Sequence, residues 1–386
     1  MSKMTPQDMA ALRHQLHRIP EVSGAEVQTA AFIAAFLQEH APDQLLTGLG
    51  GHGVAAVYDS GTSGPTVLIR CELDGLPIEE LSDHPYRSTI AGNGHLCGHD
   101  GHMVIVASLA PWLAKRVLQR GRVVLMFQPA EETGKGAAAV IADPRYADIA
   151  PDFAFSLHNM PGLPVGAVAL CEGAANCASR GMRIRLTGKT SHAAEPQDGV
   201  SPAGAIALLL PQLADLGPGG ALDADFALTT VTHCQLGEAT FGIAPGAGEI
   251  WVTLRAVSDT QMQRLVTEAE ALVTKAAEAE GLGYSLDYDD IFDACENSPV
   301  ARDVLKTALS SAGYPAQMQE QPQKWSEDFG QFRKGSASVA GAQAAMFWLG
   351  SGKDQPQLHN PDYDFPDAAL PIGKAVFQQI ITDMLT

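Results

Sequence analysis

Short apolar runs rich in β-branched residues alternate with segments of helical periodicity in the first half of the chain. The runs are Val54–Tyr58, Thr66–Cys71, Val123–Gln128 and Phe153–Leu157, with a helical segment from about Gly101 to Gln119 between the second and the third. Strands and helices in this order are typical of βαβ units, which bury a parallel sheet between helices. The order therefore predicts an α/β fold with a mostly parallel central sheet, to which a late strand over Ala344–Leu349 belongs.

Two amphipathic segments come before these runs. Residues from Pro6 to about Ile19 and from Thr29 to Glu39 carry apolar side chains at helical spacing, and we predict both as helices. His14 and His17 lie three residues apart on the first of them, among arginines. We expect these two histidines on an exposed face, in a structural rather than a metal-binding role.

The middle of the chain changes character. The predicted elements are strands over Arg183–Thr187, Ala227–His233 and Ile250–Val257 and helices over Pro202–Leu213 and Asp259–Glu280. This α+β block, roughly residues 178–290, is expected to be a domain inserted into the α/β domain. The α/β domain would then be discontinuous and consist of residues 1–177 and 291–386.

Composition excludes several classes of protein. The 386 residues are enough for two domains, and the net charge of −19 argues against nucleic acid or an anionic membrane surface as a partner. The sequence has no run of about 18 apolar residues that could span a membrane, and its N-terminal segment carries charges where a signal peptide needs an apolar core. We therefore expect a cytoplasmic protein. The six cysteines are scattered without the spacing of a disulfide framework.

Ionisable side chains follow three of the predicted strands at the point where each strand ends. Glu72 and Asp74 follow the second run, Glu131 and Glu132 the third, and His158 the fourth. The carboxyl ends of parallel strands meet at one edge of an open α/β sheet, and sites form at that edge. A chance arrangement would scatter such residues along both edges, so the pattern predicts a site.

Cys97, His99 and Asp100 lie in the loop that opens the helix near Gly101, and His359 is a further candidate. Each of them alone has a structural explanation, since a single cysteine often packs as a small apolar residue and a single histidine often lies in a turn. Together with the residues at the strand ends they predict a metal site. Thiolate, imidazole and carboxylate ligands suit zinc, manganese, nickel or cobalt better than calcium or magnesium.

These residues resemble the M20 metallopeptidases, in particular the branch of N-acyl-amino-acid amidohydrolases with aminoacylases, hippurate hydrolases and indole-acetyl-amino-acid hydrolases. The resemblance covers nearly the whole chain. Its main motifs are Arg70-Cys71-Glu72-Leu73-Asp74-Gly75-Leu76-Pro77, His95-Leu96-Cys97-Gly98-His99-Asp100-Gly101-His102, Gln128-Pro129-Ala130-Glu131-Glu132, Leu157-His158, Ser191-His192-Ala193-Ala194-Glu195-Pro196 and Leu358-His359-Asn360-Pro361. The cysteine–glycine–histidine–aspartate element and the paired glutamates are the most specific of them.

The resemblance implies a zinc-peptidase-like catalytic domain that holds two divalent metal ions, zinc, manganese, nickel or cobalt. The implied ligands are Cys97, His99, Glu132, His158 and His359, with His99 at the bridging position. Glu131 would be the general base and acid for a metal-bridged water, and Asp74 would hold a ligand by a hydrogen bond. The inserted domain would form a homodimer, and His192 would enter the site of the other subunit and stabilise the oxyanion.

The sequence departs from the family pattern at three positions. Glu72 stands where an aspartate is usual, Gly242 where an asparagine is usual, and Gln197 where a histidine is frequent. Arg255 is a candidate for binding a substrate carboxylate, and structural pairing within the insert is an equal alternative.

The predicted function is hydrolysis of the amide bond of N-acyl or N-aroyl amino acids. The alternatives are a dipeptidase or carboxypeptidase of the same superfamily and a catalytically silent binding protein, which the missing asparagine would favour. The motifs leave the acyl group, the amino acid and the metal open.

Overall fold

The computed structural model describes residues 4–386 and divides the chain into two compact units. The first unit comprises the chain up to Ala175 together with Glu296–Glu320 and Asp328–Thr386, and the second comprises Asn176–Cys295 and Gln321–Glu327. The range expected for the insert, 178–290, lies inside the second unit. A short segment from late in the chain, 321–327, belongs to the second unit as well.

An eight-stranded mixed sheet forms the centre of the first unit, in the order β1-β2-β4-β3-β5-β16-β6-β15. The strands are β1 (Gln44–Leu49), β2 (Gly53–Asp59), β3 (Thr66–Glu72), β4 (Arg122–Gln128), β5 (Phe153–Pro161), β6 (Val168–Cys171), β15 (Gln317–Gln319) and β16 (Gln343–Gly352). The four central strands β4, β3, β5 and β16 run parallel. Strands β1 and β2 pair antiparallel with their neighbours, and β6 pairs antiparallel with β16 but parallel with β15. The predicted α/β fold with a mostly parallel sheet is confirmed.

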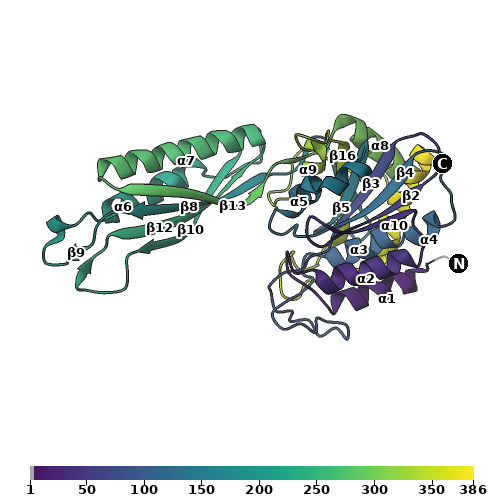
Figure 1. The fold of residues 1–386 in the computed structure, drawn as a ribbon, viewed down its shortest axis with the longest axis horizontal. Helices are drawn as coiled ribbons and strands as arrows, with labels where there is room; N and C mark the ends of the chain where they lie inside the picture. Colours follow the sequence, from purple (N-terminus) through teal and green to yellow (C-terminus); the bar gives the residue numbers. More distant parts are fainter. Residues whose placement is uncertain (1–3) are drawn as a thin grey trace. The chain divides into compact units, whose positions relative to one another are not determined.

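Helices lie on both faces of this sheet (Figure 1). They are α1 (Pro6–His17), α2 (Val27–Gln38), α3 (His99–Ala107), α4 (Ala110–Leu113), α5 (Gly136–Ala142), α8 (Pro299–Ser311), α9 (Gly330–Lys334) and α10 (Leu370–Leu385), with 3-10 turns at Pro144–Ile149 and Asp367–Ala369. Strands β3 and β4 are buried almost throughout because helices cover both of their faces. One apolar core joins α1, α2, α3, α8 and α10 to one face of the sheet.

The helix expected from Gly101 to Gln119 is shorter in the structure than in the prediction. It begins at His99, ends at Ala107 and is followed by the four-residue helix α4. Arg116 then adopts a left-handed backbone conformation with φ 55°, which an α-helix does not tolerate. The early start matters because it places His99 in the first turn of α3.

Helix α1 corrects one expectation. Its apolar positions face the core as the periodicity predicts, but His17 is fully buried and His14 only partly exposed. The guanidinium of Arg13 is buried beside them, with the carboxylates of Asp100 at 2.9 Å and Asp364 at 2.8 Å. Acidic partners from distant segments compensate the positive charge, so Arg13 and His17 are buried where we expected an exposed face.

The second unit is a four-stranded antiparallel sheet in the order β10-β12-β8-β13 with helices α6 and α7 packed on one face. Its elements are β7 (Ala174–Asn176), β8 (Ala178–Thr187), β9 (Ser191–His192), a 3-10 turn (Pro196–Asp198), α6 (Ala203–Leu216), β10 (Ala227–Leu236), β11 (Ile243–Ala244), β12 (Ala247–Ala256), α7 (Asp259–Ala279), β13 (Gly283–Phe292) and β14 (Cys295–Glu296). Strand β7, whose last residue Asn176 opens this unit, pairs with β14. This separate antiparallel domain agrees with the predicted α+β block.

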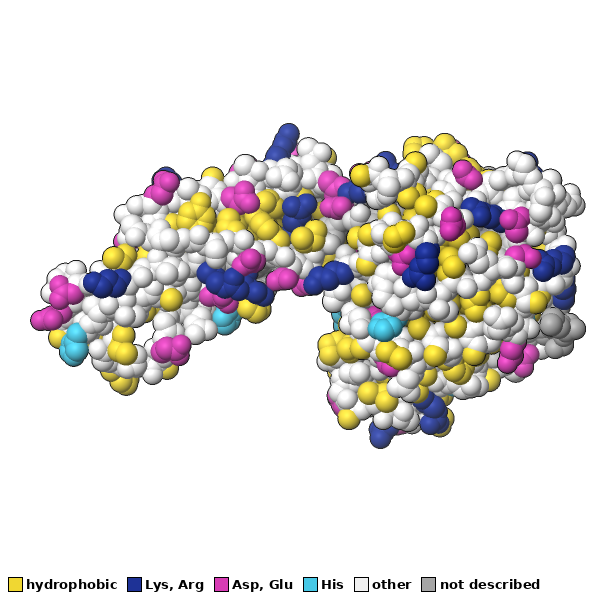
Figure 2. All heavy atoms as spheres, in the orientation of Figure 1, with side chains coloured by type: hydrophobic (Ala, Val, Ile, Leu, Met, Phe, Trp, Pro, Cys, Tyr) yellow, Lys and Arg dark blue, Asp and Glu magenta, His cyan; other side chains and the backbone are white. Residues whose placement is uncertain are grey.

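Cross-strand ion pairs occupy the face of this second sheet that the helices leave open. Arg185 lies 2.9 Å from Glu249 on β12, and Arg183 lies 3.1 Å from Asp289 on β13. Figure 2 likewise shows basic side chains scattered among acidic ones over the described surface that it draws, with no single basic patch. Within residues 4–386, no helix combines the length and the apolar character that a membrane crossing requires.

Candidate metal centre

The structure brings all five predicted ligands together at the carboxyl edge of the central sheet. Donor atoms of Cys97, His99 and His158 lie within 4.8 Å of one another, and so do those of Cys97, Glu132 and His359. These residues come from the loop before α3, from α3 itself, from the loop after β4, from β5 and from the loop after β16. The residue common to both groups is Cys97, whereas the resemblance implied that His99 would bridge.

Gly98 makes the close spacing of Cys97 and His99 feasible. Its φ of 94° is in the left-handed region that favours glycine, and a Cβ at this position would lie 2.5 Å from the side-chain oxygen of Asn159. The chain can therefore turn sharply between two donor residues while it packs directly against the end of β5.

Hydrogen bonds leave one ring nitrogen of His99 and one of His158 available for a cation. Nδ1 of His99 lies 2.9 Å from the carbonyl oxygen of Asp74, and Nδ1 of His158 lies 2.9 Å from the carbonyl oxygen of Asn159. A carbonyl only accepts, so Nδ1 carries a proton in both rings, and in the neutral form of each ring Nε2 has the lone pair that a metal can bind. Metal-binding histidines commonly have this arrangement.

The lone pairs left in this way converge. Nε2 of His158 lies 3.5 Å from the sulfur of Cys97. Nε2 of His99 and Oε1 of Glu132 are buried and have no hydrogen-bond partner among the described residues. Buried acceptors without partners are costly, and a cation at this point would satisfy several of them at once. The donor set therefore fits a metal ion.

Three carboxylates surround these donors: those of Glu131 and Glu132 lie near the histidine nitrogens, and that of Asp74 contacts the backbone of Glu132. Oε1 of Glu132 lies 3.4 Å from Nε2 of His359, whereas Oε2 of Glu131 lies 4.0 Å from Nε2 of His99. Asp74 lies behind them, where its Oδ2 accepts hydrogen bonds from the backbone N–H of Glu132 at 3.0 Å and from the hydroxyl of Ser23 at 2.7 Å. Asp74 thus contacts the segments that carry two predicted ligands.

Burial and charge shift the proton affinities of these donors in opposite directions. Burial, followed by the nearby carboxylate of Glu132, raises the pKa of the Cys97 thiol well above its usual value. Burial lowers the pKa of His158 well below its usual value. Burial would lower the pKa of His99 too, but Asp74 and the other carboxylates outweigh it and raise that pKa to about 10. The raised pKa values mean that Cys97 and His99 hold their protons when no metal is bound, and a metal that bound there would displace these protons.

The structure places two other candidates, His192 and Arg255, in the second unit. The ring of His192 is exposed on β9, and its Nδ1 lies 3.1 Å from the backbone N–H of Ala194. Arg255 donates to the carbonyl oxygen of Lys324 at 2.9 Å and to the hydroxyl of Ser326 at 3.0 Å. These contacts lie within the second unit and fit the structural alternative that was open for Arg255.

Sequence reasoning assigned no role at this centre to Asn159 or to His102. His102 belongs to the motif of Cys97 and His99, and one turn of helix separates it from His99, so its position was a usable signal. Asn159 follows His158 directly, and only the structure shows that its backbone and side chain contact neighbouring segments.

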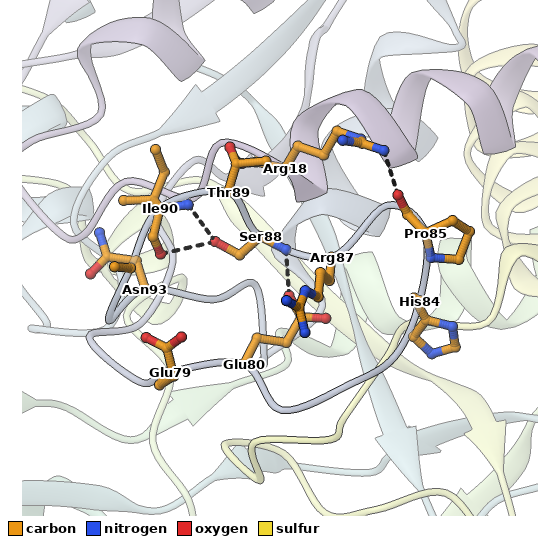
Figure 3. Close-up of a pocket in the computed structure, with 11 residues that line it drawn as sticks. Arg18, Glu79, Glu80, His84, Pro85, Arg87, Ser88, Thr89, Ile90 and Asn93 are labelled. Atoms are coloured by element: carbon orange, nitrogen blue, oxygen red, sulfur yellow. Dashed lines mark hydrogen bonds between the residues drawn. The ribbon is translucent and has the colours of Figure 1, made fainter.

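A buried network of ionisable side chains, His17, Asp100 and Glu80, adjoins the metal centre through Asp100, the residue next to His99. His17 bonds through Nδ1 to Asp100 at 2.8 Å and through Nε2 to Glu80 at 3.2 Å. Glu80 also accepts the backbone N–H of Ser88 and helps to line a surface cavity of about 570 Å³, where Arg18 bonds to the carbonyl of Pro85 (Figure 3). The network thus connects the loop around residues 79–93 to the residue next to His99.

This network predicts a decline of stability in mild alkali. Burial would lower the pKa of His17, but Asp100 and Glu80 outweigh it and raise the pKa to about 9, above the ordinary 6.5. A histidine whose pKa is raised by folding contributes stability that is complete below pH 6.5 and is lost as the pH rises through 9. Between these pH values, wild type should lose up to about 3 kcal/mol that His17→Gln does not lose.

Urea unfolding of chelator-treated protein at several pH values measures this difference without a contribution from metal uptake. The variant should be less stable than wild type at pH 6 and should approach it at pH 9.5. Equal pH slopes for the two proteins would contradict the proposed charge on His17.

Comparisons with known proteins agree with this geometry. A family model described as Peptidase family M20/M25/M40 matches residues 68–383. N-acetylcysteine deacetylase of Bacillus subtilis (strain 168) is 26% identical to this chain over 375 residues, which cover 97% of this chain and 96% of that protein. Hippurate hydrolase of Campylobacter jejuni is 29% identical over 364 residues, which cover 93% and 92%.

A solved structure shares the whole fold. The YXEP protein of Bacillus subtilis, described as a dinuclear metal binding peptidase from the M20 family, matches with a TM-score of 0.82 at 24% identity and covers 100% of this chain and 99% of that one. The family model spans well over half of the chain, so the resemblance predicted from the motifs is confirmed. The chain is an enzyme of peptidase family M20/M25/M40.

Proposed function

We propose that this enzyme hydrolyses the amide bond of N-acyl or N-aroyl amino acids, with two divalent cations at the candidate metal centre. The observation that carries the proposal is the pair of donor groups that share Cys97, together with the buried nitrogen of His99 that no described residue satisfies. The relatives support the substrate class, because N-acetylcysteine and hippurate are both acylated amino acids. The five ligands are those that the resemblance implied.

The residues of the chain divide the chemistry of amide hydrolysis between them. When bound, the cations supply Lewis acidity for the carbonyl and lower the pKa of the attacking water. Glu132 lies within 3.4 Å of His359 and is the better placed of the paired glutamates to hold a cation. Glu131, one residue earlier, takes the proton of the water and then gives it to the departing amine.

His192 is the proposed donor to the oxyanion. Its Nδ1 accepts the backbone N–H of Ala194, so the neutral ring carries its proton on Nε2, where it can donate to a developing negative charge. Strand pairing with Ile243 holds His192 on β9. We place the dimer contact in the second unit, so that His192 of one subunit serves the site of the other.

His192→Ala should lower turnover by about 10²- to 10³-fold and leave the metal content at the wild-type level, because only the oxyanion loses a donor. Steady-state kinetics and metal analysis on the same preparation measure both quantities. Loss of metal from this variant would contradict the assigned role.

A mixing experiment tests whether His192 acts across a dimer. Co-refolded His192→Ala and Glu131→Gln chains should regain about a quarter of wild-type activity, since half of the dimers are mixed and each mixed dimer has one complete site. Mixtures as inactive as the parent variants would show that His192 does not serve another subunit.

The test of the function itself combines metal analysis with a hydrolysis screen. The purified protein should bind two ions per chain and release the amino acid from N-acetyl- and N-benzoyl-amino acids faster than it cleaves a panel of dipeptides. Preference for the dipeptides would favour the peptidase alternative. Metal-loaded protein that is inert on every amide would favour a silent binding protein, the alternative that Gly242 raised.

A further inference from the structure

Glu72, His102 and Asn159 form a buried hydrogen-bonded chain that connects the carboxyl end of β3, the first turn of α3 and the end of β5. Oε2 of Glu72 lies 2.7 Å from Nδ1 of His102, and the backbone N–H of Asn159 reaches Nε2 of the same ring at 3.2 Å. All three residues are almost completely buried. We propose that this chain positions His158 and His99 for the metal and that neither Glu72 nor His102 is itself a ligand.

The hydrogen bonds of His102 decide between a ligand and a positioning residue. Donor atoms of Glu72, His99 and His102 lie within 4.8 Å of one another, which is close enough for a metal ion. Nε2 of His102, however, accepts an amide N–H and therefore carries no proton, so the proton is on Nδ1 and is donated to Glu72. Both ring nitrogens are in use, and a cation on this ring would leave a buried partner unsatisfied.

Glu72 is held from its other side as well. Its Oε1 pairs with Arg70, which also donates to Gln128 at 2.9 Å and to Asp328 at 2.7 Å. The carboxylate therefore has one oxygen for Arg70 and one for His102. This arrangement accounts for the glutamate at a position where the family usually has aspartate, because its longer side chain spans these two partners.

Asn159 transmits the position of His102 to the ligands. Its carbonyl accepts the Nδ1 proton of His158, and its side-chain amide lies 2.5 Å from the hydroxyl of Tyr363, four residues beyond His359. The backbone of Gly98 also approaches the Asn159 amide too closely for any side chain. A displacement of Asn159 would therefore disturb segments that carry several of the proposed ligands.

Glu72→Gln is the sharpest test, because the amide replaces one of the two acceptor oxygens with a donor of the same size. If the NH₂ group faces His102, the ring must move its proton to Nε2, where the N–H of Asn159 already donates. If the NH₂ group faces Arg70, two donors meet. Either orientation breaks one bond of the chain without leaving a cavity.

The inference rests on the proposed metal centre, so the readout is metal binding and not activity. Calorimetric titration of Mn²⁺ into chelator-stripped protein should show an affinity about 10- to 100-fold weaker for Glu72→Gln than for wild type, with the stoichiometry still at two ions per chain. Co²⁺-loaded protein should show a shifted visible absorption spectrum, because the ligand geometry changes. Glu72→Asp keeps the charge and both acceptor oxygens but is one methylene shorter, so it should reach only one of the two partners and recover only part of the affinity.

Asn297→Ala is the matched control for loss of a buried polar contact. Asn297 is buried in the same unit, and its amide bonds to Cys171 and Met346, away from the proposed ligands. This variant should lower the melting temperature and leave Mn²⁺ affinity unchanged. His102→Phe, which removes both hydrogen bonds of the ring and keeps its size, provides a second route to the weakened affinity if Glu72→Gln does not fold.

Three results would overturn the inference. Wild-type Mn²⁺ affinity in both Glu72→Gln and His102→Phe would show that the chain does not position the ligands. A stoichiometry reduced by one ion in Glu72→Gln would make Glu72 a ligand. Wild-type protein that binds no metal would refute the metal centre and the proposed function along with the inference, whereas the first two results leave that function intact.

Discussion

Glu131→Gln should lower turnover by about 10²- to 10⁴-fold while the protein keeps both metal ions. Glutamine has the size of glutamate and still accepts hydrogen bonds, but its amide cannot take a proton from water and pass it to the leaving amine. Glu131 is only 5% exposed, and its Oε2 lies 4.0 Å from Nε2 of His99, which places the carboxylate beside the centre in a site largely screened from bulk water. Turnover and metal content, measured on the same sample with N-acetyl-amino acids, test this expectation.

Glu132→Gln is the matched control because it makes the same chemical change one residue away. Glu132 lies closer to His359, and its Oε1 lacks a hydrogen-bond partner among the described residues, so its carboxylate should be needed for the metal itself. This variant should lose metal affinity, and added metal should partly restore its activity. If Glu131→Gln instead lost the metal and Glu132→Gln kept it, the two roles would have to be exchanged.

Much of the metal centre could be predicted from the sequence because sites in α/β sheets form at the carboxyl ends of the parallel strands. The runs that became β3, β4 and β5 are mostly apolar because helices cover both faces of the sheet, and that pattern is visible in a single sequence. Parallel strands then place the residues after them at one edge. His158, at the end of β5, and Glu132, after β4, could be expected there before any distance was known.

The structural environment of the polar residues was much harder to predict. His17 looked exposed because helical periodicity registers only its polar neighbours, whereas its burial depends on Asp100 and Glu80, which lie more than 60 residues away in the chain. The roles of Glu72 and His102 depend on which ring nitrogen meets which oxygen. No spacing rule contains that information.

One strand of the sheet in the second unit was missed for a different reason, a weak apolar pattern. Strand β13 was not predicted, although Tyr284, Leu286 and Tyr288 alternate with polar residues along it. Its register with β8 ends in an irregularity after Asp289, and Asp290 has a positive φ of 48°. Exposed residues on this strand weaken the apolar signal, so the alternation is visible only once the neighbouring strand is known.

Cys97→Ser should weaken metal binding more than any other single change at the centre. Cys97 belongs to both donor groups, so its loss affects two ions and not one. A serine hydroxyl is a harder donor and does not ionise near neutral pH, whereas a thiolate binds zinc, nickel and cobalt well. We expect a loss of affinity above about 100-fold, since changes that merely misorient ligands already cost about 10- to 100-fold. Metal analysis after gel filtration and calorimetric titration measure the loss.

Cys71→Ser separates this effect from simple damage to the core. Cys71 is as deeply buried as Cys97, but it lies within β3 among apolar side chains. A hydroxyl there should cost about 1–3 kcal/mol of stability and leave two ions bound. Wild type and Cys71→Ser should both melt at higher temperature with Mn²⁺ than without it, and Cys97→Ser should show little of this gain because the folded state no longer binds the ion tightly. A Cys97→Ser protein that kept both ions at wild-type affinity would contradict the shared-donor geometry, and the two cations would then have to be held by the histidines and Glu132 alone.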